Sequence, residues 1–138
     1  MPRWRFPFAP HDLGTYPLAN GQVYGGGEHG VENQMPVEEC GNMLILVGAL
    51  LRFEGELDFV RKYWSTLSTW ADYLLEKGYD PDNQLCTDDF AGHLAHNTNL
   101  SLKAIMALGA FSQMAAAMGD DAGAKRFRRA AEAAAQRW

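Results

Sequence analysis

The sequence predicts an all-α chain built from two consecutive αα-hairpins, and three observations lead to that prediction. Two long apolar stretches, residues 43–51 and 104–111, contain no charged side chain. Each is followed by a segment in which apolar residues recur every three or four positions, the period of one helix face. The prolines lie outside these segments or at the start of the first one, as expected for residues that interrupt a helix.

The composition of the 138 residues narrows the class of protein. A hydrophobic fraction of 47% and a charged fraction of 21% are ordinary for a soluble globular protein. The net charge of −5 argues against a nucleic-acid or anionic-membrane partner. The longest apolar run is far shorter than the roughly 20 residues that cross a bilayer. The prolines near the N-terminus do not resemble a signal peptide, so the sequence leaves the localisation open.

Residues 1–36 show no sustained period and form the first irregular segment. Prolines and glycines interrupt them repeatedly. The segment also contains five aromatic residues: Trp4, Phe6, Phe8, Tyr16 and Tyr24. So many aromatic side chains are untypical of a disordered tail, and we expect an ordered loop at the rim of the helical domain.

The first hairpin is expected over residues 37–78. Pro36 suits the first turn of a helix, where Glu38 and Glu39 face the positive end of the helix dipole. This helix, over about 37–53, is apolar all round and is therefore predicted to be buried on every side. A second helix over about 56–77 has a one-sided apolar stripe, and Gly78 is its expected stop.

A second rim loop over residues 79–97 precedes the second hairpin, expected over 98–138. Its first helix, about 98–118, is again apolar all round, with Lys103 as its only charge. The last helix starts near Asp120, and its apolar stripe is Phe127, Ala131, Ala134 and Trp138.

The hairpin repeat places the two apolar helices parallel to each other, with their N-termini at one rim. That rim should bring Glu38, Glu39 and Asn42 of the first hairpin together with residues that precede or start the second: Asp88, Asp89, His93, His96 and Asn97. Two apolar helices need more cover than two outer helices supply. We therefore expect the chain to be part of a larger toroid, covered by missing hairpins or by self-association.

Three segments of the sequence resemble the glutaminase A-type family. They are PHDLGTYPLANG at residues 10–21, MPVEECGNM at 35–43 and TDDFAGHLAHN at 87–97. The resemblance covers nearly the whole chain and implies part of an (α/α)6 barrel of the six-hairpin glycosidase type, whose members are often secreted. Only about two of six hairpins are matched, so the chain alone is expected to be weakly active or inactive.

Acid/base hydrolysis is the chemistry that these residues suggest. Adjacent helical residues point about 100° apart, so one of Glu38 and Glu39 faces the cavity while the other braces a neighbour. Glucoamylase-type barrels are similar in placing a Glu-Glu pair at this position, which favours Glu38 as the acid or base. Asp88 is the expected catalytic partner. The alternative is that these carboxylates only complement the helix dipole or cap loops.

The expected substrate-binding residues are the remaining polar side chains of the rim: His11, Asp12, Tyr16, Glu39, Asn42, Asp89, His93, His96 and Asn97. His93 and His96 lack the pattern of a metal site, so we expect hydrogen bonds to Asp12 or Asp89 instead. No phosphate loop or dinucleotide fingerprint is present, and neither a metal nor another cofactor is expected.

The resemblance thus implies a fragment of a hydrolase that acts on glutamine-like amides. The alternatives are a glycoside hydrolase of the six-hairpin type and a non-catalytic helical module or inactive fragment. Cys40 and Cys86 are expected to be free buried thiols, with a single bridge between them as the alternative.

Overall fold

The computed structural model describes residues 4–14, 17, 31, 33–88, 90 and 92–138. The described residues form four helices and no strand, which confirms the all-α prediction. The helices are α1 (Pro36–Glu54), α2 (Leu57–Lys77), α3 (Thr98–Ala117) and α4 (Asp121–Arg137).

Side chains from the rim loop satisfy the first backbone N–H groups of α1 and α3. The N–H of Val37 donates to Oε1 of Gln84 at 3.0 Å. The Asn97 side chain accepts hydrogen bonds from the N–H groups of Asn99 and Leu100 at 2.9 and 3.1 Å. Because a helix leaves its first N–H groups unpaired, these contacts fix where both helices begin.

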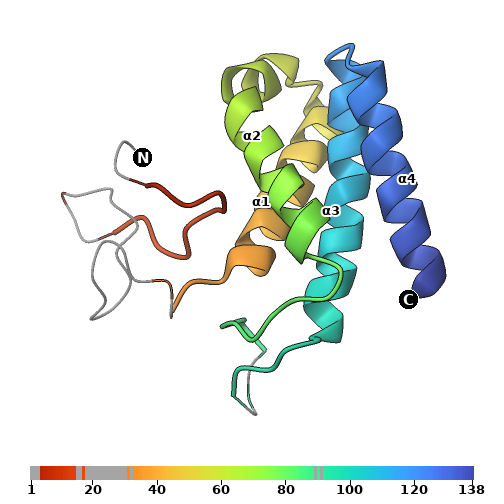
Figure 1. Ribbon diagram of the computed structural model, residues 1–138. Helices are drawn as coiled ribbons and strands as arrows, with labels where there is room; N and C mark the ends of the chain where they lie inside the picture. Colours follow the sequence, from red (N-terminus) through yellow and green to blue (C-terminus); the bar gives the residue numbers. More distant parts are fainter. Residues whose placement is uncertain (1–3, 15–16, 18–30, 32, 89, 91) are drawn as a thin grey trace.

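Helix α3 lies at the centre of the molecule and packs against α1, α2 and α4. Its Phe111 stacks on Trp64 of α2 with ring centroids 5.0 Å apart, and meets Phe127 of α4 edge-on at 4.7 Å. Helices α1 and α3 run parallel, and their N-termini lie at the same end of the molecule (Figure 1). By length and composition alone α3 could cross a membrane, but half of its apolar window is buried, as in a core helix.

Gly78 ends α2 for a different reason from the one the sequence suggested. Its φ is −84°, so it does not adopt the left-handed conformation that favours glycine at helix ends. A Cβ atom at this position would lie 2.6 Å from the Cβ atom of Ala104. Glycine therefore stands here because α3 passes close to the end of α2.

The N-terminal residues 4–14 pack along α1 and α2. The indole N–H of Trp4 donates to the carbonyl of Phe8 at 2.6 Å. The ring of Phe8 lies 5.4 Å from that of Tyr73, and the N–H of Ala9 donates to Sγ of Cys40 at 3.2 Å. The expected ordered rim segment is thus present over residues 4–14.

Helices α1 and α3 are not buried on every side within this chain, as expected if two outer helices supply too little cover for them. Leu46 and Phe53 of α1 are 63% and 82% exposed, and Met106 of α3 is 64% exposed. These side chains are uncovered because α2 and α4 do not surround the inner helices. Trp138 is also exposed, so the apolar stripe of α4 ends before it.

Candidate functional site

Glu38 lies in the first turn of α1 and is only 5% exposed. Its Oε1 accepts a hydrogen bond from Nζ of Lys103 at 2.8 Å, and its Oε2 accepts one from the backbone N–H of Thr87 at 2.7 Å. Burial raises the pKa of a carboxyl group, but these two bonds outweigh burial and hold the pKa of Glu38 below 4.5. Glu38 is therefore ionised at neutral pH, with both oxygens engaged inside the protein.

Lys103 reaches Glu38 along the surface of α1. A Cβ atom on Gly41 would lie 2.7 Å from Cγ of Lys103, so the lysine stem occupies the space that a larger residue would fill. The Lys103 side chain is 22% exposed. The ion pair therefore joins α1 to α3 where the two helices approach closely.

Glu39 has a different environment, although it is the next residue. It is half-buried, and burial raises the pKa of Glu39 above 4.5, with the negative charge of Glu38 acting in the same direction. A hydrogen bond with Asn42 and the electrostatic effects of His11 and Lys103 oppose this rise without cancelling it. Glu39 is thus the carboxyl group of the pair that holds its proton more strongly.

Asp88 lies on the rim loop, next to the residue that Glu38 binds. It is exposed, and its Oδ2 accepts a hydrogen bond from Nδ2 of Asn99 at 2.8 Å. This bond and a second one from the Cys86 side chain lower the pKa of Asp88. Asp88 is therefore an ionised carboxylate that is open to solvent.

The two cysteines are free and buried, as expected, and the alternative of a bridge between them is wrong. Burial raises the pKa of Cys40 to about 12 and that of Cys86 to about 11. Because the thiolate is the reactive form, neither thiol is suited to act as a nucleophile at neutral pH.

His96 is exposed and pairs with Asp80 of the rim loop. Its Nδ1 lies 2.5 Å from Oδ1 of Asp80, and this contact raises the pKa of His96. Of the two partners expected for His96, Asp12 is not the one it contacts, and Asp89 lies outside the described residues. His93 is also exposed. Among the described residues, no group of three or more His, Cys, Asp or Glu is placed to hold a metal ion.

The structure places the other predicted substrate-binding residues as follows. His11 and Asp12 are half-buried, and the backbone N–H of His11 donates to Oε1 of Gln34 at 2.9 Å. Asn97 uses its side chain to cap α3 and to donate to Sγ of Cys86 at 3.5 Å. Tyr16 and Asp89 lie outside the described residues. The substrate-binding roles remain predictions.

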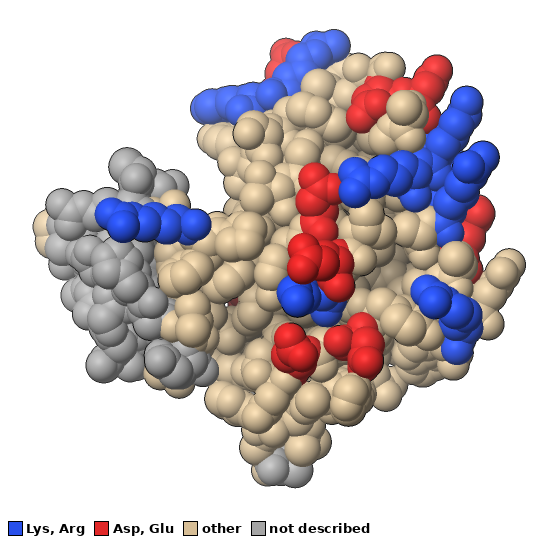
Figure 2. Space-filling model, viewed as in Figure 1, with Lys and Arg blue, Asp and Glu red and all other residues tan. Residues whose placement is uncertain are grey.

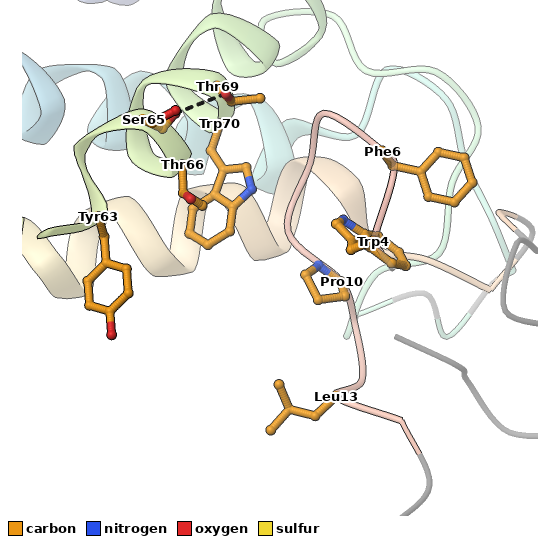
Figure 3. A pocket seen from close by; sticks show the side chains of 9 residues that line it. All are labelled: Trp4, Phe6, Pro10, Leu13, Tyr63, Ser65, Thr66, Thr69 and Trp70. Atoms are coloured by element: carbon orange, nitrogen blue, oxygen red, sulfur yellow. Dashed lines mark hydrogen bonds between the residues drawn. The ribbon is translucent and has the colours of Figure 1, made fainter. Parts of the chain in front are cut away.

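A hollow of about 470 Å³ lies away from these carboxylates, between the N-terminal segment and α2. Figure 3 shows Trp70 and Thr66 of α2 on one side of it, and Trp4 and Pro10 on the other. The nine residues that line it include no carboxylate, histidine or cation. This hollow therefore lacks the groups needed for acid/base chemistry.

Three residues of the site were not among the sequence candidates: Lys103, Thr87 and Gln84. Thr87 donates its backbone N–H to Glu38, and Gln84 accepts the Val37 N–H with its side-chain amide oxygen. Neither group leaves a sequence pattern that would have predicted its role. Lys103 does leave one, because a single cation on an otherwise apolar helix requires a partner when it is buried.

Comparison with known proteins identifies a family and two relatives that this chain resembles. The family described as "Glutaminase A six helical-hairpin domain" matches residues 1–138. Glutaminase A of Aspergillus oryzae is 42% identical over 83% of this chain, and a protein of Arthroderma benhamiae named "Probable glutaminase" is 29% identical over 95% of it. The matched regions cover 16% and 21% of these relatives, so the chain spans only a small part of their length. No solved structure gave a significant match.

Proposed function

The chain belongs to the glutaminase A six helical-hairpin family, and we propose on that premise that it forms one wall of a hydrolase site for glutamine-like amides. The observation that carries the proposal is the hydrogen bond between Glu38 and the N–H of Thr87. It brings the Glu38–Glu39 pair of α1 and the loop carboxylate Asp88 to one end of the molecule. The names of the two relatives supply the substrate class.

Hydrolysis of a carboxamide requires three functions. A base removes a proton from the attacking water, hydrogen-bond donors stabilise the oxyanion, and an acid protonates the departing ammonia. Asp88 suits the base, because its lowered pKa keeps it ionised and it is open to solvent. A glutamate of the α1 pair suits the acid, and Asn42 and His11 lie near that pair as possible donors. The products are a carboxylate and ammonia.

Glycosidic bonds are the second candidate substrate. Inverting glycosidases also use one protonated and one ionised carboxyl group, separated widely enough to admit water. The same residues would then cleave a glycosidic bond. If the chain is instead a non-catalytic module, neither amides nor glycosides are hydrolysed. The names of the relatives favour the amide.

We further propose that the opposite wall of the site comes from additional hairpins. Leu46, Phe53 and Met106 leave an uncovered apolar face on the inner helices. The family domain has six hairpins, whereas the described part of this chain forms two successive helix pairs. Packing of further hairpins against this face would bury it, which is the arrangement that large exposed apolar patches generally indicate.

The test uses a longer protein in which this chain is joined to the further hairpins proposed above. Ammonia release from L-glutamine and product release from a panel of aryl glycosides are measured for the wild type and for Asp88→Asn. We expect release of ammonia that falls by about 10²–10⁴-fold in the variant, the usual contribution of a general base. Glu132→Gln, an exposed glutamate of α4, is the matched control and should be unaffected. Turnover of a glycoside without ammonia release would replace the amide by the sugar, and turnover of neither would favour a non-catalytic module.

A further inference from the structure

The two adjacent glutamates of α1 are used differently by the fold. Both oxygens of Glu38 accept hydrogen bonds from the protein, one from Lys103 and one from the Thr87 N–H. Glu38 is 5% exposed, whereas Glu39 is half-buried. To donate a proton, Glu38 would first have to become neutral beside an ammonium group that stabilises its charge. Its surroundings therefore oppose an acid role.

The contacts of Glu38 instead control the position of the loop. Its bond to Thr87 holds the residue just before Asp88, and Asn99 of α3 holds Asp88 itself through a 2.8 Å hydrogen bond. Lys103 connects the same carboxylate to α3, with its stem lying on Gly41. The loop is thus attached to α1 at one residue and to α3 at the next. Such support keeps a reacting group within the narrow tolerance that catalysis needs.

We propose that Glu39 is the proton donor of the site, and that the Lys103–Glu38 pair is a positioning device that holds the Thr87–Asp88 loop against α1. The inference rests on the proposed function, because it decides which glutamate of the pair transfers the proton. It reverses the order that the glucoamylase-like resemblance favoured. Lys103 acts through Glu38 and is a positioning residue.

The charged groups around Glu39 come from three elements. Glu38 on the same helix raises the pKa of Glu39, while Lys103 of α3 and His11 of the N-terminal segment lower it, together with the Asn42 hydrogen bond. Burial exceeds these opposing effects and raises the pKa of Glu39 overall. A carboxyl group that keeps its proton closer to neutral pH is the better general acid.

The first experiment needs no substrate. Carboxyl carbon resonances of the two glutamates are followed by ¹³C NMR from pH 2 to pH 8 in the 138-residue chain, with Glu38→Gln and Glu39→Gln to assign them. We expect Glu38 to titrate below 4.5 and Glu39 above it, as the directions of their shifts indicate. The reverse order would overturn the inference, whatever the activity of the longer protein.

The second experiment measures ammonia release from L-glutamine by the longer protein as a function of pH. Glu39→Gln should lower kcat by about 10²–10⁴-fold, the range of a general acid. Lys103→Met should lower kcat by up to about 10²-fold through displacement of the loop. The basic limb of the pH profile, set by Glu39, should persist and move to higher pH, because the Lys103 charge lowers the pKa of Glu39. Lys103→Arg, which keeps the charge, should recover part of that loss and also serves if Lys103→Met does not fold.

The outcomes distinguish failure of the Glu39 assignment from failure of the proposed amide hydrolysis. Near-wild-type kcat in Glu39→Gln would exclude Glu39 as the acid and would overturn the inference. Loss of the basic limb in Glu38→Gln alone would overturn it as well, by assigning the proton transfer to Glu38. A wild-type protein that releases no ammonia, with Glu39 still titrating above Glu38, would instead contradict the proposed function.

Discussion

Replacing Lys103 by methionine should destabilise the chain by about 2–3 kcal/mol at pH 7. Removing one partner of a fully buried ion pair costs about 3–5 kcal/mol, because the remaining charge is left without compensation. Glu38 is 5% exposed and would keep only the Thr87 N–H, but the Lys103 side chain is 22% exposed, so water can replace part of the lost contact. Methionine retains most of the stem that lies on Gly41, which limits the loss of packing.

A double-mutant cycle isolates the ion pair from other effects of the substitution. Glu38→Gln alone should also destabilise, since it leaves the ammonium of Lys103 without its carboxylate. In the double variant neither charge remains, so its cost should be about 1–2 kcal/mol smaller than the sum of the two single costs, as for other residues in contact.

The effect should depend on pH with a definite sign. The pKa of Glu38 is lowered in the folded chain, so its ionised form contributes stability that is fully present above 4.5 and lost as pH falls through the lowered folded value. In Lys103→Met, burial is no longer offset by the ammonium, and Glu38 should take up a proton at higher pH than in the wild type. The difference between wild type and variant should therefore shrink on acidification.

Urea unfolding followed by circular dichroism is the assay. With a slope of about 1–3 kcal/mol/M for a chain of this size, the expected loss lowers the midpoint by roughly 0.7–3 M. Lys125→Met, on the exposed face of α4, is the control and should stay within about 0.5 kcal/mol of the wild type. A Lys103→Met chain as stable as that control, or two single costs that simply add, would refute the view that the ion pair connects α1 to α3.

Three further predictions follow from the same geometry. Glu39→Gln should stabilise the chain at pH 7, because ionising a carboxyl group whose pKa is raised by folding costs stability as pH rises from 4.5 through the folded pKa. The gain in urea midpoint of the variant over the wild type should therefore be larger at pH 8 than at pH 4, and an equal gain at both would contradict this. Gly41→Ala should cost about 1–3 kcal/mol by displacing the lysine stem, whereas Gly109→Ala, which meets nothing within 4 Å, should be neutral or stabilising by up to about 1 kcal/mol; comparable urea midpoints for the two variants would argue against the close approach. The exposed Leu46 and Phe53 should promote self-association and dye binding in the isolated chain. Leu46→Ser with Phe53→Ser should reduce both in light scattering and fluorescence, and unchanged signals in the double variant would contradict this.

The helices were predictable because local signals agree with the fold. The apolar runs, the one-sided stripe of α2 and the acidic first turn of α1 each depend on neighbours within a few residues. The parallel arrangement of α1 and α3 also followed from chain order, and it placed Glu38 and the rim loop at one end. The extent of cover is not a local property: an all-round apolar helix predicts burial, but Phe53 and Met106 are exposed because α2 and α4 do not surround α1 and α3.

Long-range pairings set the parts of the site that the sequence could not specify. His96 binds Asp80 rather than Asp12, because the rim loop folds back so that the N–H of His96 reaches the carbonyl of Pro81 at 2.8 Å. No local pattern encodes such a return of the chain. The same holds for Gly78, whose place at the end of α2 depends on a close approach of α3.

The division of roles between Glu38 and Glu39 shows the limit most clearly. Helical geometry required the two side chains to face different surroundings, so that one would brace a neighbour. Which one does so depends on Lys103, 65 residues further along the chain, and on the loop N–H of Thr87. A cation held against one glutamate keeps that glutamate ionised. Burial then has the largest effect on the pKa of the other glutamate. An acidic pair at the start of an inner helix can therefore be assigned only when the charged residues of the neighbouring helix are considered with it.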